Sequence, residues 1–205
     1  ACSQEPVLPT TEQSETDAPI APWQENVHYR VLAQPASEAP IVQEFFSFWC
    51  PHCYNFEPIV KQIKAQLGSD TAFEKVHVDF MGVTSRSIQQ GASKAMIIAR
   101  SMGIEDTINT AIFTHIHLDK KDLSGIDDIK PLFLAAQVSE QDFNDALNST
   151  KIEKLVTKHN ATFSQYQGDI KSVPTIVVNG KYMATFTRDM TINDIVELIV
   201  WLSNK

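Results

Sequence analysis

Two cysteines three positions apart carry the most specific chemistry in this sequence. Residues 50–53 read Cys-Pro-His-Cys, and Cys2 is the only other cysteine among the 205 residues. A Cys-x-x-Cys pair is either a redox-active dithiol or half of a zinc site. A purely structural disulfide is the third interpretation, but closing so short a loop gains little chain entropy.

A zinc site needs two further Cys or His ligands. Cys2 is distant in sequence, and His77 or His159 would have to be recruited singly. His115 and His117 are two positions apart, and residues at that spacing do not face each other on a helix. We therefore predict no metal site, and a redox-active pair that requires no cofactor.

The redox interpretation has a specific mechanism. Pro51 is favoured at the first position of a helix, which makes Cys50 the N-cap residue. The sulfur of Cys50 then faces the free N–H groups of His52 and Cys53. These N–H groups, the helix dipole and a protonated His52 all stabilise a thiolate at Cys50. A stabilised thiolate favours the reduced protein, so the disulfide form becomes the stronger oxidant. Cys53, one turn inside the helix, is expected to be the more buried, resolving thiol.

Composition excludes several other classes of protein. The chain has 17 Lys and Arg against 25 Asp and Glu, a net charge of −8, and no basic cluster that could bind nucleic acid. No apolar run is long enough to span a bilayer. Three cysteines are too few for a disulfide-stapled scaffold. The 43% apolar content is sufficient for one folded core with an insertion.

The hydrophobic pattern predicts a β-α-β unit around the dithiol. Residues 41–48 are almost continuously apolar, as in a strand covered on both faces. Residues 51–67 fit a helix, and residues 73–80 alternate as a second central strand. The helical crossover makes the two strands parallel. Residues 29–32 fit a short edge strand.

Beyond residue 84 the pattern becomes helical. Apolar residues recur at helical spacing between positions 88 and 99. Four more helices are predicted, at residues 106–118, 126–137, 140–148 and 152–164. These are too many for a simple crossover, so we expect an inserted helical domain. The strand pattern then returns as a hairpin with an Asn-Gly turn, followed by a last helix; these elements cover residues 175–178, 181–186 and 192–202. We expect Thr191 to cap the last helix, with Asp194 three residues on.

Glu44 is the carboxylate within the apolar segment 41–48. Burial there should raise its pKa, which would let it take up the proton of Cys53 during exchange. It could equally be a structural carboxylate paired with Lys75 on the next strand. The residues alone leave both interpretations open.

Three segments resemble the DsbA family of bacterial periplasmic disulfide oxidases. They are residues 44–54 (EFFSFWCPHCY), residues 75–82 (KVHVDFMG), and residues 172–175 with 178–182 (SVPT and VNGKY). The resemblance in spacing runs from about residue 27 to the C-terminus. It implies an α/β thioredoxin fold, formed by residues 27–83 and 168–205, with an inserted helical domain at residues 84–167.

The resemblance also implies roles for individual residues. It makes Cys50 the nucleophile and Cys53 its partner. It implies that the bond before Pro174 is cis and that the backbone near Val173 pairs with an extended substrate segment.

Two further positions match the family's proposed buried proton relay. They are Glu44 and Lys75.

The function implied by the resemblance is oxidation of reduced, unfolded proteins entering the bacterial periplasm. A DsbB-like membrane protein would reoxidise the dithiol and pass the electrons to quinone. The alternatives are a disulfide reductase or isomerase on the same fold, and a chaperone-like peptide-binding module whose dithiol is incidental. We see no segment that could form the added dimerisation domain of an isomerase, so we expect a monomer.

The N-terminal residues depart from the family. Residues 3–22 include four prolines and four acidic residues, and no Lys or Arg precedes Arg30. This composition predicts a disordered linker over residues 1–26. Ala-Cys-Ser at positions 1–3 resembles the start of a lipidated chain after removal of a signal peptide. Two interpretations stay open: Cys2 carries a lipid that tethers the protein to the membrane, or it is an idle third thiol on a soluble chain.

Overall fold

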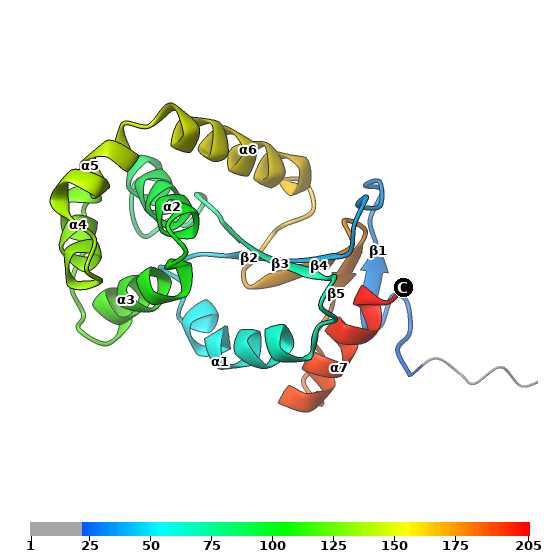
Figure 1. Cartoon of the computed structure of the whole chain (residues 1–205). Coiled ribbons are helices and arrows are strands. Elements are labelled where there is room, and N and C mark those ends of the chain that lie inside the picture. The colour runs from blue at the N-terminus through cyan, green and yellow to red at the C-terminus, as the bar shows by residue number, and fades with distance from the viewer. Residues whose placement is uncertain (1–21) are drawn as a thin grey trace, which may run out of the picture.

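The computed structural model describes residues 22–205, and residues 1–21, with Cys2, lie outside the described part. The described part contains five strands and seven helices (Figure 1). In chain order they are β1 (Tyr29–Val31), β2 (Ile41–Phe46), α1 (Pro51–Gln66), β3 (Ala72–His77), α2 (Arg86–Ser101), α3 (Glu105–His117), α4 (Ile126–Ala135), α5 (Glu140–Leu147), α6 (Thr150–Tyr166), β4 (Thr175–Val178), β5 (Tyr182–Ala184) and α7 (Ile192–Ser203).

One mixed sheet organises the fold, with strand order β1-β5-β4-β2-β3. The predicted β-α-β unit is confirmed, because β2 and β3 are parallel while β2 pairs antiparallel with β4. The predicted edge strand is also confirmed as β1, and it pairs with β5. Strand β2 lies between two neighbours, which explains why its sequence is apolar on both faces.

Both strands of the β-α-β unit are shorter than predicted, and β3, which was predicted to be a central strand, lies at the edge of the sheet beside β2. Strand β2 ends at Phe46 instead of residue 48 because Ser47 begins a turn. The N–H of Trp49 donates to Ser47 Oγ at 3.2 Å, and the N–H of Cys50 donates to the Ser47 carbonyl at 3.1 Å. Strand β3 ends at His77 instead of residue 80, and only the N–H of Val78 still bonds to β2. The turn at Ser47 carries the chain from β2 into α1.

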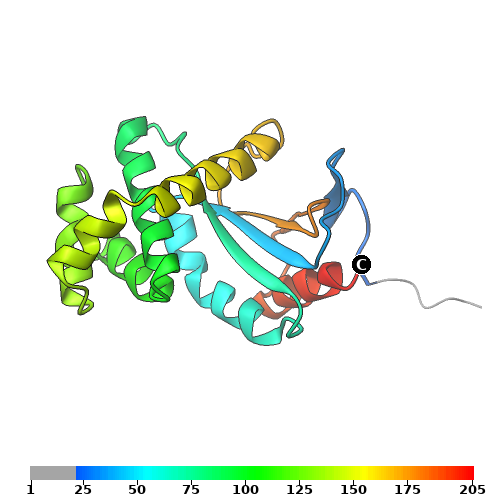
Figure 2. The ribbon, with the colours of Figure 1, turned by 45° about the horizontal axis from the view of Figure 1, so that its top comes forward.

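Helices cover both faces of the sheet (Figure 2). Helices α1 and α7 pack on one face, around Val42 and Ile176, and α6 packs on the other, where Phe163 contacts the cluster around Phe45. Helix α6 lies in the stretch predicted to be an inserted helical domain, and it nevertheless covers the sheet. The boundaries at residues 84 and 167 stay predictions.

Helices α2 to α5 gather at one end of the sheet, away from β1 (Figure 1). Their buried side chains, such as Met96 and Phe113, form one cluster with Phe48 and with both cysteines, Cys50 and Cys53. The dithiol therefore lies at the junction between the helical part and the sheet.

The C-terminal hairpin and helix follow the predicted pattern. Asn179 and Gly180 both have positive φ, of 51° and 71°, as a two-residue hairpin turn of this type requires. The hydroxyl of Tyr166 donates to the Gly180 carbonyl at 3.1 Å, which fixes the turn against α6. Thr191 and Asp194 form a capping box at the start of α7, which confirms the predicted cap.

The predicted linker over residues 1–26 is wrong for its last residues. Trp23 packs against the cluster beneath α1 and α7, and its ring lies edge-on to His28 with centroids 5.2 Å apart. Glu25 forms a β-bridge with Tyr29. Partial burial of the indole ring stabilises this segment, an effect that the acidic, proline-rich composition concealed. Within residues 22–205, none of the helices has the length and apolarity needed to cross a membrane.

Candidate active site

Cys50 is the N-cap residue of α1, with extended backbone angles (φ −91°, ψ 115°) and Pro51 in the first turn of the helix. Its sulfur accepts a hydrogen bond from the backbone N–H of Cys53 at 3.3 Å. The sequence predicted a second such bond from the N–H of His52, and the contacts of Cys50 in the structure do not include it. The side chain of His52 is exposed to solvent. The helix start thus offers Cys50 one direct N–H donor and the positive end of the helix dipole.

Cys53 is a chemically different thiol. Its side chain is completely buried, in the interior cluster that also contains Phe48. Burial raises the pKa of Cys53 far above its ordinary value, the backbone of Ser47 lowers it in part, and the charge of Glu44 is among the influences that raise it. Cys53 therefore holds its proton strongly, as expected for the inner thiol of the pair.

The loop before β4 brings a backbone carbonyl to the dithiol. The Sγ of Cys50 lies 3.5 Å from the carbonyl oxygen of Val173, to which it donates. The Val173–Pro174 peptide bond is cis, as the resemblance implied. Because β4 pairs antiparallel with β2, its first residue lies beside the end of β2, from which α1 follows. The pairing of β2 with β4 thus brings the loop at Val173 next to Cys50, although the two are far apart in sequence.

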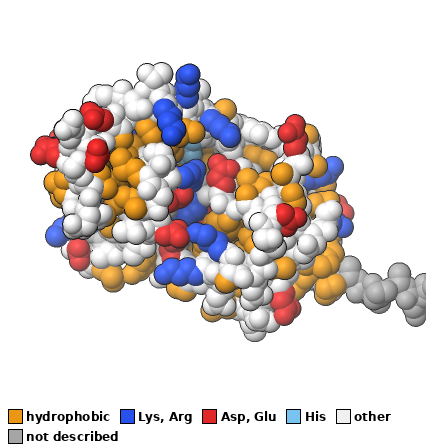
Figure 3. Space-filling model, in the orientation of Figure 1, with side chains coloured by type: hydrophobic (Ala, Val, Ile, Leu, Met, Phe, Trp, Pro, Cys, Tyr) orange, Lys and Arg blue, Asp and Glu red, His pale blue; other side chains and the backbone are white. Residues whose placement is uncertain are grey.

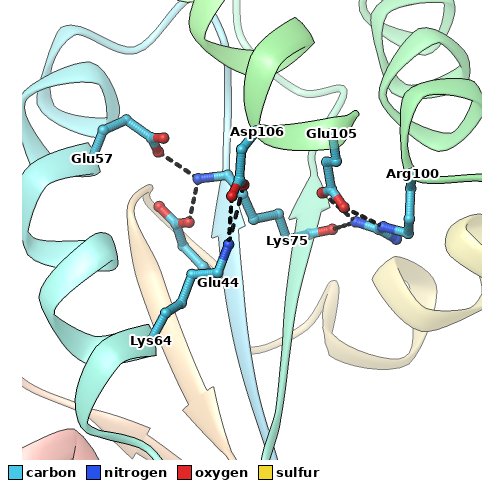
Figure 4. A network of polar contacts seen from close by, with 7 residues as sticks. All are labelled: Glu44, Glu57, Lys64, Lys75, Arg100, Glu105 and Asp106. Carbon is cyan, nitrogen blue, oxygen red and sulfur yellow. Dashed lines mark hydrogen bonds and ion pairs between the residues drawn. The ribbon is translucent and has the colours of Figure 1, made fainter. Parts of the chain in front are cut away.

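Three charged side chains, from β2, β3 and α1, meet near the start of α1 (Figure 4). The Nζ of Lys75 donates to Glu44 Oε2 at 2.6 Å and also to Glu57 Oε1. Glu44 is fully buried, Lys75 is 4% exposed and Glu57 is partly exposed. The Nζ of Lys75 also lies 4.3 Å from the ring centroid of Phe46. The ion pair between Glu44 and Lys75 that the sequence suggested is present.

The single ammonium group of Lys75 cannot neutralise the carboxylates of both Glu44 and Glu57. The site therefore favours protonation of one carboxylate. Burial raises the pKa of Glu44, and the negative charge of Glu57 adds to this while Lys75 opposes it. Burial lowers the pKa of Lys75, but the charges of Glu44 and Glu57 outweigh burial and raise it. Lys75 therefore stays charged, and Glu44 takes up a proton more readily than an exposed glutamate. The Oε1 atom of Glu44 is buried without a hydrogen-bond partner in the structure.

Further ion pairs hold this site between α1, β3 and the helices beside it. Arg100 donates to the backbone carbonyl of Lys75 at 2.8 Å and to both carboxylate oxygens of Glu105. Lys64 on α1 pairs with Asp106 on α3. Figure 3 shows acidic and basic side chains gathered along the middle of this face of the molecule, between the helical end and the sheet.

Glu57 is a site residue that the sequence reasoning missed. It lies four residues after Cys53 on the same helix, and residues at that spacing share a face. That spacing was a usable signal, because an acidic residue placed there must point towards the same side as the buried thiol.

The histidines weighed as metal ligands do not converge. His115 contacts the Asp122 carbonyl, and His117 contacts the Phe48 carbonyl instead. His77 and His159 are buried, with a hydrogen bond from His159 to the His77 carbonyl at 2.9 Å. Among residues 22–205, no three His, Cys, Asp or Glu side chains are grouped so that they could hold a metal ion.

The fold and the site together define a class of protein. A sheet of this topology with helices on both faces is a thioredoxin fold, and its dithiol beside a cis-proline loop places the protein among the thiol–disulfide oxidoreductases. The family model described as "Thioredoxin" matches residues 32–199. Curated relatives and solved structures narrow the class further, and the chain belongs to the DsbA family.

The similarities extend over most of the chain. It is 34% identical over 169 residues to the thiol:disulfide interchange protein DsbA of Pectobacterium carotovorum subsp. carotovorum, covering 81% of this chain and 78% of that protein. It is 29% identical over 197 residues to DsbA of Escherichia coli K12, covering 92% of each. The crystal structure of DsbA from Proteus mirabilis superposes with a TM-score of 0.78 at 28% identity, covering 89% of this chain and 98% of that one. A Proteus mirabilis DsbA complex with a non-covalently bound peptide gives a TM-score of 0.79 at 28% identity, covering 90% of this chain and 100% of that one.

Proposed function

We propose that the protein oxidises reduced, unfolded proteins by donating its Cys50–Cys53 disulfide to them. The observation that carries this proposal is the position of Cys50. Its sulfur lies at the start of α1, accepts the N–H of Cys53, and contacts the carbonyl of Val173. The Cys53 N–H and the N-terminus of α1 face the Cys50 sulfur, which marks it as the sulfur that a substrate thiolate attacks, while burial raises the pKa of Cys53 and leaves it as the protonated partner.

The reaction transfers two electrons from the two substrate thiols to the Cys50–Cys53 disulfide. A substrate thiolate attacks Cys50 Sγ, the Cys50–Cys53 bond breaks, and the electron pair leaves on Cys53, which takes up a proton. The second substrate thiol loses its proton and attacks the substrate sulfur in the mixed disulfide. Cys50 then leaves as a thiolate. The substrate gains a disulfide and the protein ends as the dithiol.

Glu44 and Lys75 are proposed as the proton relay for Cys53. The raised pKa of Glu44 lets it hold a proton near the dithiol, and its charge influences Cys53. Lys75 holds one oxygen of Glu44 and leaves the other without a partner. The relay predicts that Glu44→Gln slows the exchange step at least tenfold, as expected for loss of a general acid–base group. An unchanged rate would leave the pair a purely structural role.

The backbone beside Pro174 is proposed to hold the substrate. The carbonyl of Val173 lies next to the Cys50 sulfur that the substrate attacks, where an extended peptide could pair with it as an added strand. The peptide-bound Proteus mirabilis DsbA supports a peptide as the ligand of this type of site.

Family membership supports the remaining parts of the proposal. The protein would act in the bacterial periplasm, as a monomer, and a DsbB-like membrane protein linked to quinone would reoxidise its dithiol. The test is reoxidation of reduced protein by membranes that contain a DsbB-like protein, compared with membranes that lack it. Equal rates in both would contradict this partner.

Two measurements test the direction of the reaction. A reduced peptide with two cysteines should be oxidised by the wild-type protein and not by Cys50→Ser; oxidation by this variant would point to a peptide-binding module with an incidental dithiol. The equilibrium with glutathione separates an oxidase from a reductase, because an oxidase stays reduced at glutathione ratios that oxidise a reductase. We expect His52→Ala to move that equilibrium towards the disulfide, since it removes the imidazole that lies between the two cysteines in sequence and is expected to stabilise the reduced form.

Cys2 is proposed to carry a lipid, with the acidic, proline-rich segment after it as a tether. The support is the Ala-Cys-Ser sequence at residues 1–3. Both features lie outside the residues that the structure describes. Mass spectrometry of the N-terminal peptide from native membranes is the test, and an unmodified Cys2 would end the proposal.

A further inference from the structure

One side chain from α3 contacts the chain on both sides of the dithiol. The Nε2 of His117 lies 2.7 Å from the carbonyl oxygen of Phe48, to which it donates. Phe48 precedes Cys50 by two residues and is 69 residues away from His117 in sequence. The hydrogen bond therefore joins the last turn of α3 to the segment that leads into the active site.

The same imidazole ring stacks on Tyr54, the residue that follows Cys53. The two ring centroids are 5.1 Å apart and the planes differ by only 10°. The N–H of Tyr54 donates to the Cys50 carbonyl at 3.1 Å, so Tyr54 belongs to the first turn of α1. Phe113, one helical turn before His117, also lies against Tyr54, with centroids 5.8 Å apart. His117 thus touches the residue two positions before the dithiol and the residue directly after it.

The turn that carries Cys50 also has backbone hydrogen bonds of its own. Ser47 accepts the N–H groups of both Trp49 and Cys50. The ring of Phe48 is completely buried and stacks on His77 at 4.8 Å. The Phe48 carbonyl accepts its hydrogen bond from a different element, because the donor is His117 on α3. Loss of that donor would leave a partly enclosed carbonyl unpaired, and the turn could move to satisfy it.

The geometry points to His117 as a positioning residue for the dithiol. It fixes the turn at residues 47–50 and the first turn of α1 so that the Cys50 sulfur meets the N–H of Cys53. A backbone N–H donates a stronger hydrogen bond to a reduced, electron-rich sulfur than to a disulfide sulfur, so holding the contact between the Cys53 N–H and the Cys50 sulfur favours the reduced protein. His117 therefore favours the dithiol over the disulfide. This inference rests on the proposed oxidase function in one respect: a bias towards the dithiol makes the protein a stronger oxidant, which is useful only to an oxidase.

Substitutions at His117 separate its two contacts. His117→Phe keeps a stacking ring and loses the donor. His117→Gln keeps an amide N–H near the position of Nε2 and loses the ring. His117→Ala loses both contacts. His115→Ala is the matched control, because His115 lies on the same helix and contacts the Asp122 carbonyl, outside the active-site turn.

The readout is the equilibrium constant with glutathione. His117→Phe should move it towards the disulfide by about fivefold, the factor for loss of one hydrogen bond. His117→Ala should move it at least as far, His117→Gln less than His117→Phe, and His115→Ala should match the wild type. No shift in His117→Phe and His117→Ala, or an equal shift in His115→Ala, would overturn the inference. The wild-type constant tests the proposed function, whereas the difference between variants tests this inference.

Unfolding of both redox forms in urea distinguishes positioning from simple stabilisation. A positioning role predicts that His117→Phe destabilises the reduced form more than the oxidised form. Equal destabilisation of the two forms would show a merely structural role and would overturn the inference. The comparison needs only that each form unfolds reversibly, so a less stable variant still gives a decisive result.

Discussion

The Nζ of Lys75 lies 2.6 Å from Oε2 of Glu44, and the two residues occupy directly paired positions on β3 and β2. Glu57 reaches the same ammonium from α1. Such a group of charges costs desolvation free energy, and it is held by the strands on one side and the helix on the other. The group has consequences for stability and for pH dependence.

Replacing Glu44 with Gln should stabilise the protein above about pH 5. Burial raises the pKa of Glu44 in the folded state, so its contribution to stability is present below the ordinary value of 4.5 and is lost as pH rises through the folded value. At pH 8 the Gln variant avoids an ionised buried carboxyl, while Lys75 keeps Glu57 as its partner. We expect a gain on the order of 1 kcal/mol in urea unfolding. A Gln variant less stable than the wild type at pH 8 would contradict this.

Replacing Lys75 with Met should have the opposite effect. The change leaves Glu44 and Glu57 as neighbouring acids without their shared cation. Removing one partner of a buried ion pair typically costs about 3 to 5 kcal/mol. The loss should be smaller at pH 5 than at pH 8, because Glu44 can then take up a proton. Urea unfolding at the two pH values measures the difference, and an equal loss at both would argue against charge as the cause.

The two thiols of the reduced protein should differ in reactivity. The thiolate is the reactive form, and burial raises the pKa of Cys53, so Cys53 remains a neutral thiol near pH 7. Cys50 lies at the helix N-terminus with a hydrogen bond to its sulfur. Iodoacetamide should label Cys50 at least about tenfold faster than Cys53. Peptide mass spectrometry gives both rates, and comparable labelling would contradict the assignment of Cys50 as nucleophile.

Two buried histidines should make the protein less stable in mild acid. Burial lowers the pKa of His77 well below its ordinary value of 6.5, and burial also lowers that of His159. The unfolded chain therefore binds protons that the folded chain does not, and stability falls as pH drops below about 6.5. Each histidine contributes up to about 1.4 kcal/mol per pH unit.

His159→Gln tests this effect. The amide can still donate to the His77 carbonyl, but it does not titrate. The variant should lose less stability than the wild type between pH 6.5 and pH 5, as measured by urea unfolding at each pH. Identical slopes in the two proteins would show that His159 does not cause the acid sensitivity.

Gly180→Ala should destabilise the C-terminal hairpin. Gly180 has a φ of +71°, and a Cβ atom there would lie 3.0 Å from the Pro35 carbonyl oxygen and 3.3 Å from the Tyr166 hydroxyl. Strained backbone and steric overlap together should cost about 2 kcal/mol or more. Gly91→Ala is the control, because Gly91 lies in α2 with open space around it, and its replacement should stabilise the protein by about 0.5 to 1 kcal/mol. Thermal unfolding of the two variants should therefore shift in opposite directions.

The order and type of the elements could be predicted because they follow from local spacing. The hairpin turn at Asn179 and Gly180 and the cap at Thr191 both depend on residues close in sequence, and both were predicted. The end of β2 was misplaced because Phe48 continues the apolar pattern after Ser47 has already turned the chain.

Long-range packing was harder to predict. Helical spacing gives the apolar face of α6, but not its partner, so the contact of its Tyr166 with Phe45 could not be anticipated. The dithiol was recognised from four consecutive residues. The contact of His117 with Phe48 has no local signal, because it depends on where α3 packs.

The contact between Cys50 and the Val173 carbonyl spans 123 residues and depends on β4, which lies in the centre of the sheet. A chain emerging vectorially from the ribosome cannot complete this sheet until its last strands have been synthesised. The two cysteines are therefore synthesised long before the loop at Val173 that faces them. During that interval the site around the dithiol is incomplete in the nascent chain. Such high contact order is expected to slow folding.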